Sequence, residues 1–154
     1  MRNHCRRSLA GAMLTTLLVS FWCAGVLHAQ GASVSLYKRL GGYDAIAAVT
    51  DDFIGRLAGD PQFVRFFSGL SKDSLGKLRQ HVVEQICNFA GGPCVYIGRD
   101  MKTSHAGLGI TEAEWNASVK HFVASLDKFK VGEKEKGELL AAVSSLKKDI
   151  AEKP

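Results

Sequence analysis

The sequence predicts an all-α domain, and three observations support this fold class. Four segments after residue 42 carry apolar residues three to four positions apart, the spacing of one face of an amphipathic helix. No stretch alternates apolar and polar residues, as a half-buried strand would, over more than a few positions. Glycine and proline clusters separate the periodic segments. We therefore expect four main helices in two pairs, with a non-periodic connection between the pairs.

The first 29 residues have the composition of an export signal. Arg2, Arg6 and Arg7 give a basic start, residues 9–26 are apolar and nearly uncharged, and Ala29 is a small residue suited to cleavage. The alternative is an uncleaved membrane anchor, because the apolar run approaches the ~20 residues that a transmembrane helix needs. We expect a signal peptide over residues 1–29, a domain over residues 30–154, and export to the periplasm or another extracytoplasmic compartment. Membrane contact is expected only if the signal is retained.

Most of the net charge belongs to this signal. It holds three of the 20 basic residues and none of the 15 acidic ones, which leaves 17 against 15 and a net charge of +2. The remaining basic residues form only short pairs such as Lys147-Lys148, whereas a nucleic-acid interface needs a concentrated basic face. We expect no nucleic-acid partner.

The amino-terminal half of the domain is predicted to hold two long helices. A helical turn over residues 36–40 stops at Gly41-Gly42, and a short aromatic helix follows Pro61. The second long helix ends before Gly91. The inward faces expected for the two long helices are Ile46, Val49, Phe53 and Leu57, then Leu75, Leu78, Val82, Ile86 and Phe89.

The carboxyl-terminal half is predicted to hold the other pair. Thr111 and Glu114 form a capping box that starts the first of these helices. A break at Val131-Gly132 precedes the second. Residues 94–110, between the two halves, lack periodicity, and a connection of this length in a small domain is usually functional. The expected inward faces are Trp115, Val119, Phe122, Leu126 and Phe129, then Leu139, Val143, Leu146 and Ile150.

Two cysteines remain outside the signal, Cys87 and Cys94. In an exported chain an even number of cysteines predicts a disulfide rather than free thiols. The loop that this bond closes is short, so its stabilisation should fall at the low end of the ~2–4 kcal/mol range.

The domain contains three histidines, His81, His105 and His121. A zinc site from His81, His105, Cys87 and Cys94 is one possibility, but structural zinc ligands usually come in closely spaced pairs and six residues separate these cysteines. The other possibility is a haem iron held by one neutral imidazole. His105 is the candidate ligand because it lies in the glycine-rich connection, where Tyr96 and Met101 could line an apolar pocket. His121 is expected at the surface.

A haem also needs a wide apolar slot and cations for its propionates, and the sequence supplies both. The candidate cations are Arg79, Arg99 and Lys102. The candidate slot residues, all apolar or aromatic, are Phe53, Phe66, Phe67, Leu78, Val82, Tyr96, Met101 and Trp115.

Residues 36–150 resemble the truncated haemoglobins of group I, the two-on-two helical globins. The resemblance rests on the order and spacing of four pieces: residues 36–42, Phe66-Phe67, residues 91–93, and Tyr96 through Met101 to His105. It implies a two-over-two helical sandwich around one haem b (iron protoporphyrin IX) per chain. It also implies that His105 is the proximal iron ligand and that Phe67 packs on the haem face.

The side chains expected opposite His105 depart from the family pattern. Many members have a distal tyrosine where this chain has Ile54, and distal glutamines where it has Leu78 and Val82. These residues offer no hydrogen-bond donor to a polar gas ligand. His81 resembles the position that gives the iron a second imidazole in some cyanobacterial-type members. We expect it to be the sixth ligand, to donate to the gas ligand, or to stay at the haem edge or in solvent.

Three functions follow from these features. The first is a globin that reversibly binds O₂, NO or CO at ferrous iron, in oxygen binding or transport or an NO-related role, with an unidentified reductase as partner. An NO dioxygenase side activity would need that reductant. The alternative is an electron-transfer or redox-sensing protein with both His81 and His105 on the iron. The third is an interaction domain without haem, in which His105 is incidental.

Overall fold

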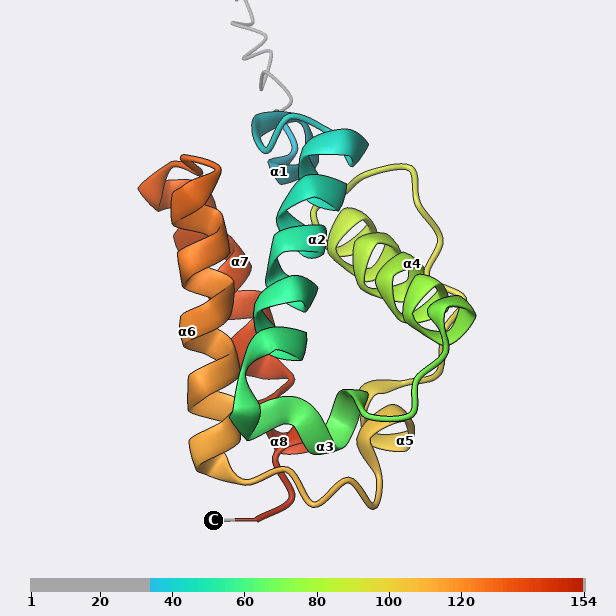
Figure 1. Ribbon diagram of the computed structural model, residues 1–154. Coiled ribbons are helices and arrows are strands. Elements are labelled where there is room, and N and C mark those ends of the chain that lie inside the picture. Colours follow the sequence, from blue (N-terminus) through green and yellow to red (C-terminus); the bar gives the residue numbers. More distant parts are fainter. Residues whose placement is uncertain (1–33, 154) are drawn as a thin grey trace, which may run out of the picture. The chain divides into compact units, whose positions relative to one another are not determined.

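Residues 34–153 of the computed structural model are described here, and within them the chain folds into helices with a single isolated β-bridge between Thr111 and Lys153 (Figure 1). The predicted signal peptide lies outside these residues. None of the helices described is long and apolar enough to cross a membrane. The helices are α1 (Leu36–Arg39), α2 (Tyr43–Gly59), the 3-10 turn η1 (Pro61–Phe63), α3 (Val64–Phe67), α4 (Lys72–Phe89), α5 (Met101–His105), α6 (Glu112–Lys128), α7 (Glu133–Ser145) and α8 (Lys147–Ile150).

Helix α2 is central, since it contacts both α4 and α6 (Figure 1). It starts at a sharp corner, where Gly41 and Gly42 have φ angles of 94° and 83° that suit glycine. The Tyr43 N–H, at its first position, donates to the Tyr37 hydroxyl across this corner at 3.1 Å. The buried residues Ile46 and Val49 belong to the two apolar clusters that α2 forms with its neighbours.

Helix α4 has two apolar faces, and the sequence predicted only one of them as buried. Val83 and Cys87 are fully buried in a cluster with Ile46 and Ala47 of α2. Phe89 was expected on the inward face, and that prediction is wrong because its side chain is 51% exposed. The remaining residues of the predicted face are half-buried, namely Leu75, Leu78, Val82 and Ile86.

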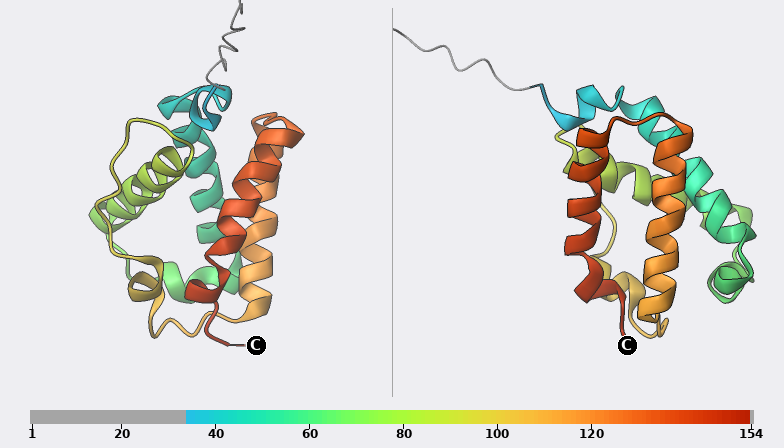
Figure 2. Two further views of the ribbon diagram at one scale, coloured as in Figure 1. Left: turned by 180° about the vertical axis from the view of Figure 1, so that it is seen from behind. Right: turned by 90° about the vertical axis from the view of Figure 1, so that its left-hand side faces the viewer.

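Helices α6 and α7 form the second pair and run side by side in every view (Figures 1 and 2). The predicted capping box is present: the Glu114 N–H donates to Thr111 Oγ1 at 3.2 Å, and the Thr111 N–H donates to Glu114 Oε2 at 2.8 Å. The pair closes a core cluster that contains Leu36, Val49, Ala90, Phe122, Leu126 and Leu139. The two-over-two sandwich predicted from the sequence is therefore confirmed.

Candidate haem site

His105 is the last residue of α5, and its ring is oriented by its own helix. Asp100 caps this helix by accepting a hydrogen bond from the Thr103 N–H at 2.8 Å. His105 Nδ1 lies 2.8 Å from the Met101 carbonyl oxygen. Because a carbonyl oxygen only accepts hydrogen bonds, Nδ1 carries the proton, and Nε2 of the neutral ring keeps a lone pair. This arrangement is typical of a histidine that binds a metal.

The residues predicted to lie opposite His105 are apolar residues of α2 and α4. Ile54, Leu78 and Val82 are half-buried, whereas Val49 and Val83 on other faces of the same two helices are buried in the core. Leu78 and Val82 are four residues apart and therefore share a face of α4. Partial exposure suits residues that line a slot, and none of the three carries a hydrogen-bond donor.

The predicted aromatic residues fall into two groups. Phe66 and Phe67 lie on α3 and are half-buried. Phe53 packs edge-on against Phe122 with ring centroids 5.3 Å apart, and Trp115 is buried on α6, so these two also belong to the helix packing. Phe63 was not among the predicted slot residues; its side chain is buried, and its ring centroid lies 6.2 Å from that of Phe66.

The three candidate cations differ in their surroundings. Arg79 forms a two-point ion pair with Asp51 of α2, in which Nη2 lies 2.9 Å from Oδ2. Hydrogen bonding in this pair raises the pKa of Arg79 and lowers that of Asp51. Arg99 and Lys102 form no ion pair with any residue of 34–153. These two are therefore the better candidates for the haem propionates.

His81 projects from α4 with its side chain 43% exposed. Its ring packs edge-on against Tyr96, with centroids 6.0 Å apart. The Tyr96 hydroxyl donates to the Arg99 carbonyl at 2.6 Å, and burial raises the pKa of Tyr96. His81 Nδ1 and Glu84 Oε2 are buried, 3.9 Å apart, and have no hydrogen-bond partner within the described residues.

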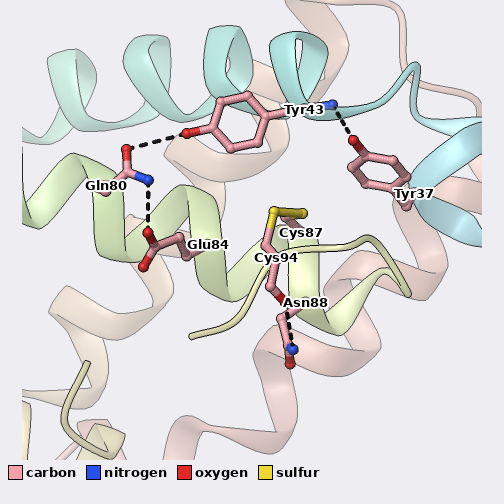
Figure 3. The surroundings of a disulfide bond; sticks show 7 residues. All are labelled: Tyr37, Tyr43, Gln80, Glu84, Cys87, Asn88 and Cys94. Carbon is pink, nitrogen blue, oxygen red and sulfur yellow. Dashed lines mark hydrogen bonds between the residues drawn. A yellow bond between two sulfur atoms is a disulfide. The ribbon is translucent and has the colours of Figure 1, made fainter. Parts of the chain in front are cut away.

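The sulfur atoms of Cys87 and Cys94 lie at bonding distance, 1.97 Å (Figure 3). Asn88 donates from Nδ2 to the Cys94 carbonyl at 3.0 Å, so a second contact ties this loop to α4 (Figure 3). Within residues 34–153 no three His, Cys, Asp or Glu side chains gather as a metal site. The zinc possibility therefore has no support.

His121 is more enclosed than the surface position predicted for it. Its Nε2 lies 2.7 Å from Asp60 Oδ2, and its ring lies 5.9 Å from that of Phe63. The side chain extends from α6 to the turn that follows α2, and this tertiary contact was not visible in the helical spacing.

Comparison with known proteins agrees with this fold. A model of the bacterial-like globin family matches residues 35–152. The group 1 truncated hemoglobin of Mycolicibacterium paratuberculosis is 32% identical over 117 residues, which cover 76% of this chain and 84% of that protein. The Fe(III) truncated hemoglobin of Tetrahymena pyriformis superposes with a TM-score of 0.69 at 22% identity, covering 77% of this chain and 98% of that one. The 2/2 hemoglobin of Synechococcus, solved in the cyanomet state with covalently attached heme, superposes with a TM-score of 0.68 at 26% identity. That alignment covers 76% of this chain and 98% of the Synechococcus chain.

The fold and the family match define a haem-binding globin. The candidate site residues fit a haem. They supply an imidazole with an available Nε2, half-buried apolar side chains, and two cations without an ion-pair partner among residues 34–153. Within the globins, the chain belongs to the bacterial-like family, and its curated relatives are group 1 truncated hemoglobins.

Proposed function

We propose that this globin reversibly binds O₂, or another diatomic gas such as NO or CO, at the ferrous iron of one haem b per chain. His105 is the proximal ligand in this proposal. The observation that carries it is the hydrogen bond between His105 Nδ1 and the Met101 carbonyl, which leaves Nε2 as the coordinating nitrogen. The haem, when bound, would supply a ferrous iron at which a diatomic gas can bind.

The chain itself contributes three things to gas binding. The Met101 carbonyl holds the His105 ring in one tautomer and orientation, and it increases the electron donation of the imidazole. The half-buried Leu78 and Val82 exclude water from an apolar slot. Arg99 and Lys102, which have no ion-pair partner among residues 34–153, are available to the two propionates.

The cellular setting follows from the sequence alone and is part of the proposal. Residues 1–29 direct export to an extracytoplasmic compartment, where a reductase returns the iron to the ferrous state. The electron-transfer alternative, with both His81 and His105 on the iron, has no specific observation in its favour.

Absorption spectra of the purified protein in the ferric, ferrous and CO-treated states test the proposal. We expect haem bands in all three and complete, fast binding of CO by the ferrous form. His105→Gly should lose the histidine-ligated ferrous spectrum, and added imidazole should restore it. The matched control is His121→Ala, which removes a histidine bound to Asp60. A colourless protein, or an unchanged spectrum for His105→Gly, contradicts the proposal.

A further inference from the structure

The loop that follows His105, residues 106–110, is held by side chains from distant parts of the chain. Gly107 and Gly109 have φ angles of 79° and 59°, so the loop leaves α5 by left-handed turns instead of continuing the helix. One backbone bond, from the Leu108 N–H to the His105 carbonyl at 3.1 Å, connects it directly to His105. The position of the loop therefore affects the position of His105.

Arg65 binds the carbonyl groups of this loop. Its Nη1 donates to the Leu108 oxygen at 2.7 Å, and its Nη2 donates to the Gly109 oxygen at 3.2 Å. Arg65 lies on α3 beside Phe66, and its guanidinium carbon is 3.9 Å from the centre of that ring. One side chain thus connects the loop behind His105 to the aromatic helix of the slot.

The Arg65 side chain is itself oriented by Glu114. Its Nη2 lies 3.0 and 2.9 Å from the two carboxylate oxygens, and Nε lies 3.2 Å from Oε1. Glu114 is only 10% exposed, and the Thr111 N–H holds it in the capping box of α6. The Thr111 N–H and Arg65 lower the pKa of Glu114, which keeps the carboxylate charged. A fixed anion at the start of α6 therefore aims the guanidinium at the loop.

Glu152 binds the N–H groups of the same loop. Its Oε1 accepts from Gly107 at 2.7 Å, and its Oε2 accepts from Gly109 at 2.5 Å. The Glu152 N–H also donates to the Ile110 carbonyl at 2.9 Å. Beyond α8, the chain passes below α6 close to this loop (Figure 1). The loop is thus bound through its carbonyl groups by one charged side chain and through its N–H groups by another.

We propose that Arg65 and Glu152 are positioning residues for the iron ligand, which fix the direction of His105 Nε2 by holding residues 106–110 from both sides. The proposal rests on the proposed role of His105. Charge-assisted hydrogen bonds to backbone groups suit this task because they are short and directional. Within residues 34–153 neither side chain forms a hydrogen bond with the His105 ring, so both act through the backbone.

The test compares Arg65→Met and Glu152→Ala with wild type in two measurements on the haem-loaded full chain. The first is the iron–histidine stretching band in the resonance Raman spectrum of the ligand-free ferrous protein. The second is the rate of haem transfer to excess apomyoglobin. We expect a shifted or broadened band and haem transfer about tenfold faster or more, the usual effect of removing a partner behind a metal ligand. In Glu152→Gln one acceptor oxygen remains, so its band should lie between those of wild type and Glu152→Ala.

Arg39→Met is the matched control, because Arg39, like Arg65, binds both carboxylate and backbone carbonyl groups. Its partners are the carboxylates of Glu135 and Glu138 and the carbonyl of Val34, and it joins α1 to α7. If Arg65→Met and Glu152→Ala have the same band position and the same rate of haem transfer as Arg39→Met, the inference is overturned. A wild-type protein whose ferrous haem is five-coordinate but shows no iron–histidine band overturns the proposed role of His105 instead. If Arg65→Met loses its helical circular dichroism, Arg65→Lys is measured in its place, together with Glu152→Gln. Unchanged iron–histidine bands in both of these variants also overturn the inference.

Discussion

At the residue scale, the hydrogen-bond partner of each histidine decides what its ring can do. His105 has a backbone acceptor at Nδ1, which leaves Nε2 with a lone pair. His121 is bound to Asp60. His81 packs on Tyr96 and has an unpartnered Nδ1 within the described residues. The sequence located His105 by its position in the connection and by the family resemblance. Its partner could not be predicted because the length and end of α5 depend on packing.

Removing the His81 ring tests its role as a candidate sixth ligand. Because the ring is packed against Tyr96, we expect the ferric and ferrous absorption bands of His81→Ala to match those of wild type. Tyr96→Phe is the control, since it keeps the aromatic contact and loses the hydroxyl. Loss of a six-coordinate ferrous spectrum in His81→Ala would instead support the electron-transfer alternative.

Adding a hydroxyl at Ile54 tests the apolar wall. If Ile54 faces the bound gas, the phenolic hydroxyl that Ile54→Tyr introduces should donate a hydrogen bond to O₂. We expect the O₂ dissociation rate to fall about tenfold or more, as a hydrogen bond to a charged or strongly polar group implies. Stopped-flow mixing of the oxygenated protein with CO measures this rate. Ile54→Phe supplies the same bulk without the donor, so equal rates in the two variants would place residue 54 away from the ligand.

At the scale of elements, the connection from α4 to α5 is attached to α4 at several points. Cys94 meets the buried Cys87, and Asn88 binds the Cys94 carbonyl (Figure 3). Tyr96 packs on His81. The sequence predicted a non-periodic segment here, and also the cysteine pair. It did not predict that the connection returns along α4, because non-periodic segments leave no pattern from which their path follows.

Removing the cysteine pair tests this attachment. We expect Cys87→Ala/Cys94→Ala to lower the free energy of unfolding by about 2–3 kcal/mol, because the closed loop restricts the unfolded chain. Urea denaturation of both proteins, with and without a reductant, measures the change. The reductant should destabilise only the wild type. Reaction of both Cys87 and Cys94 with a thiol reagent in the unfolded, unreduced wild type would show that no disulfide had formed.

At the scale of the whole molecule, ion pairs join elements that are far apart in sequence. Asp52 of α2 accepts hydrogen bonds from Lys128 Nζ at 2.5 Å and Ser125 Oγ at 2.8 Å, both on α6, and from Arg56 on its own helix. Lys128 and then Arg56 hold the pKa of Asp52 far below its usual range. Arg79 lowers the pKa of Asp51. Thr111 and Arg65 lower the pKa of Glu114. Opposite charges thus support the contacts of α2 with α4 and α6.

These lowered pKa values predict sensitivity to acid. A carboxylate whose pKa is lower in the folded than in the unfolded state stabilises the fold above the unfolded pKa, near 4, and loses this effect as pH falls through the folded value. We expect the urea midpoint to be lower at pH 3 than at pH 7. Asp52→Asn should lower the midpoint at pH 7 and reduce the difference between the two pH values. Asp44→Asn, an exposed change on the same helix, is the control and should leave that difference unaltered.

The sequence by itself determined the helix pairs, the glycine corners, the capping box and the place of His105, because each depends on neighbours within a few residues. The family resemblance was readable for the same reason, since it lies in the spacing of short pieces. The tertiary structure alone decided which face of α4 is buried, which carboxylate pairs with Arg79, and which side chains bind the loop behind His105. Arg65 and Glu152 lie more than forty residues from Gly109 on either side, and only the packing of the helices brings them together.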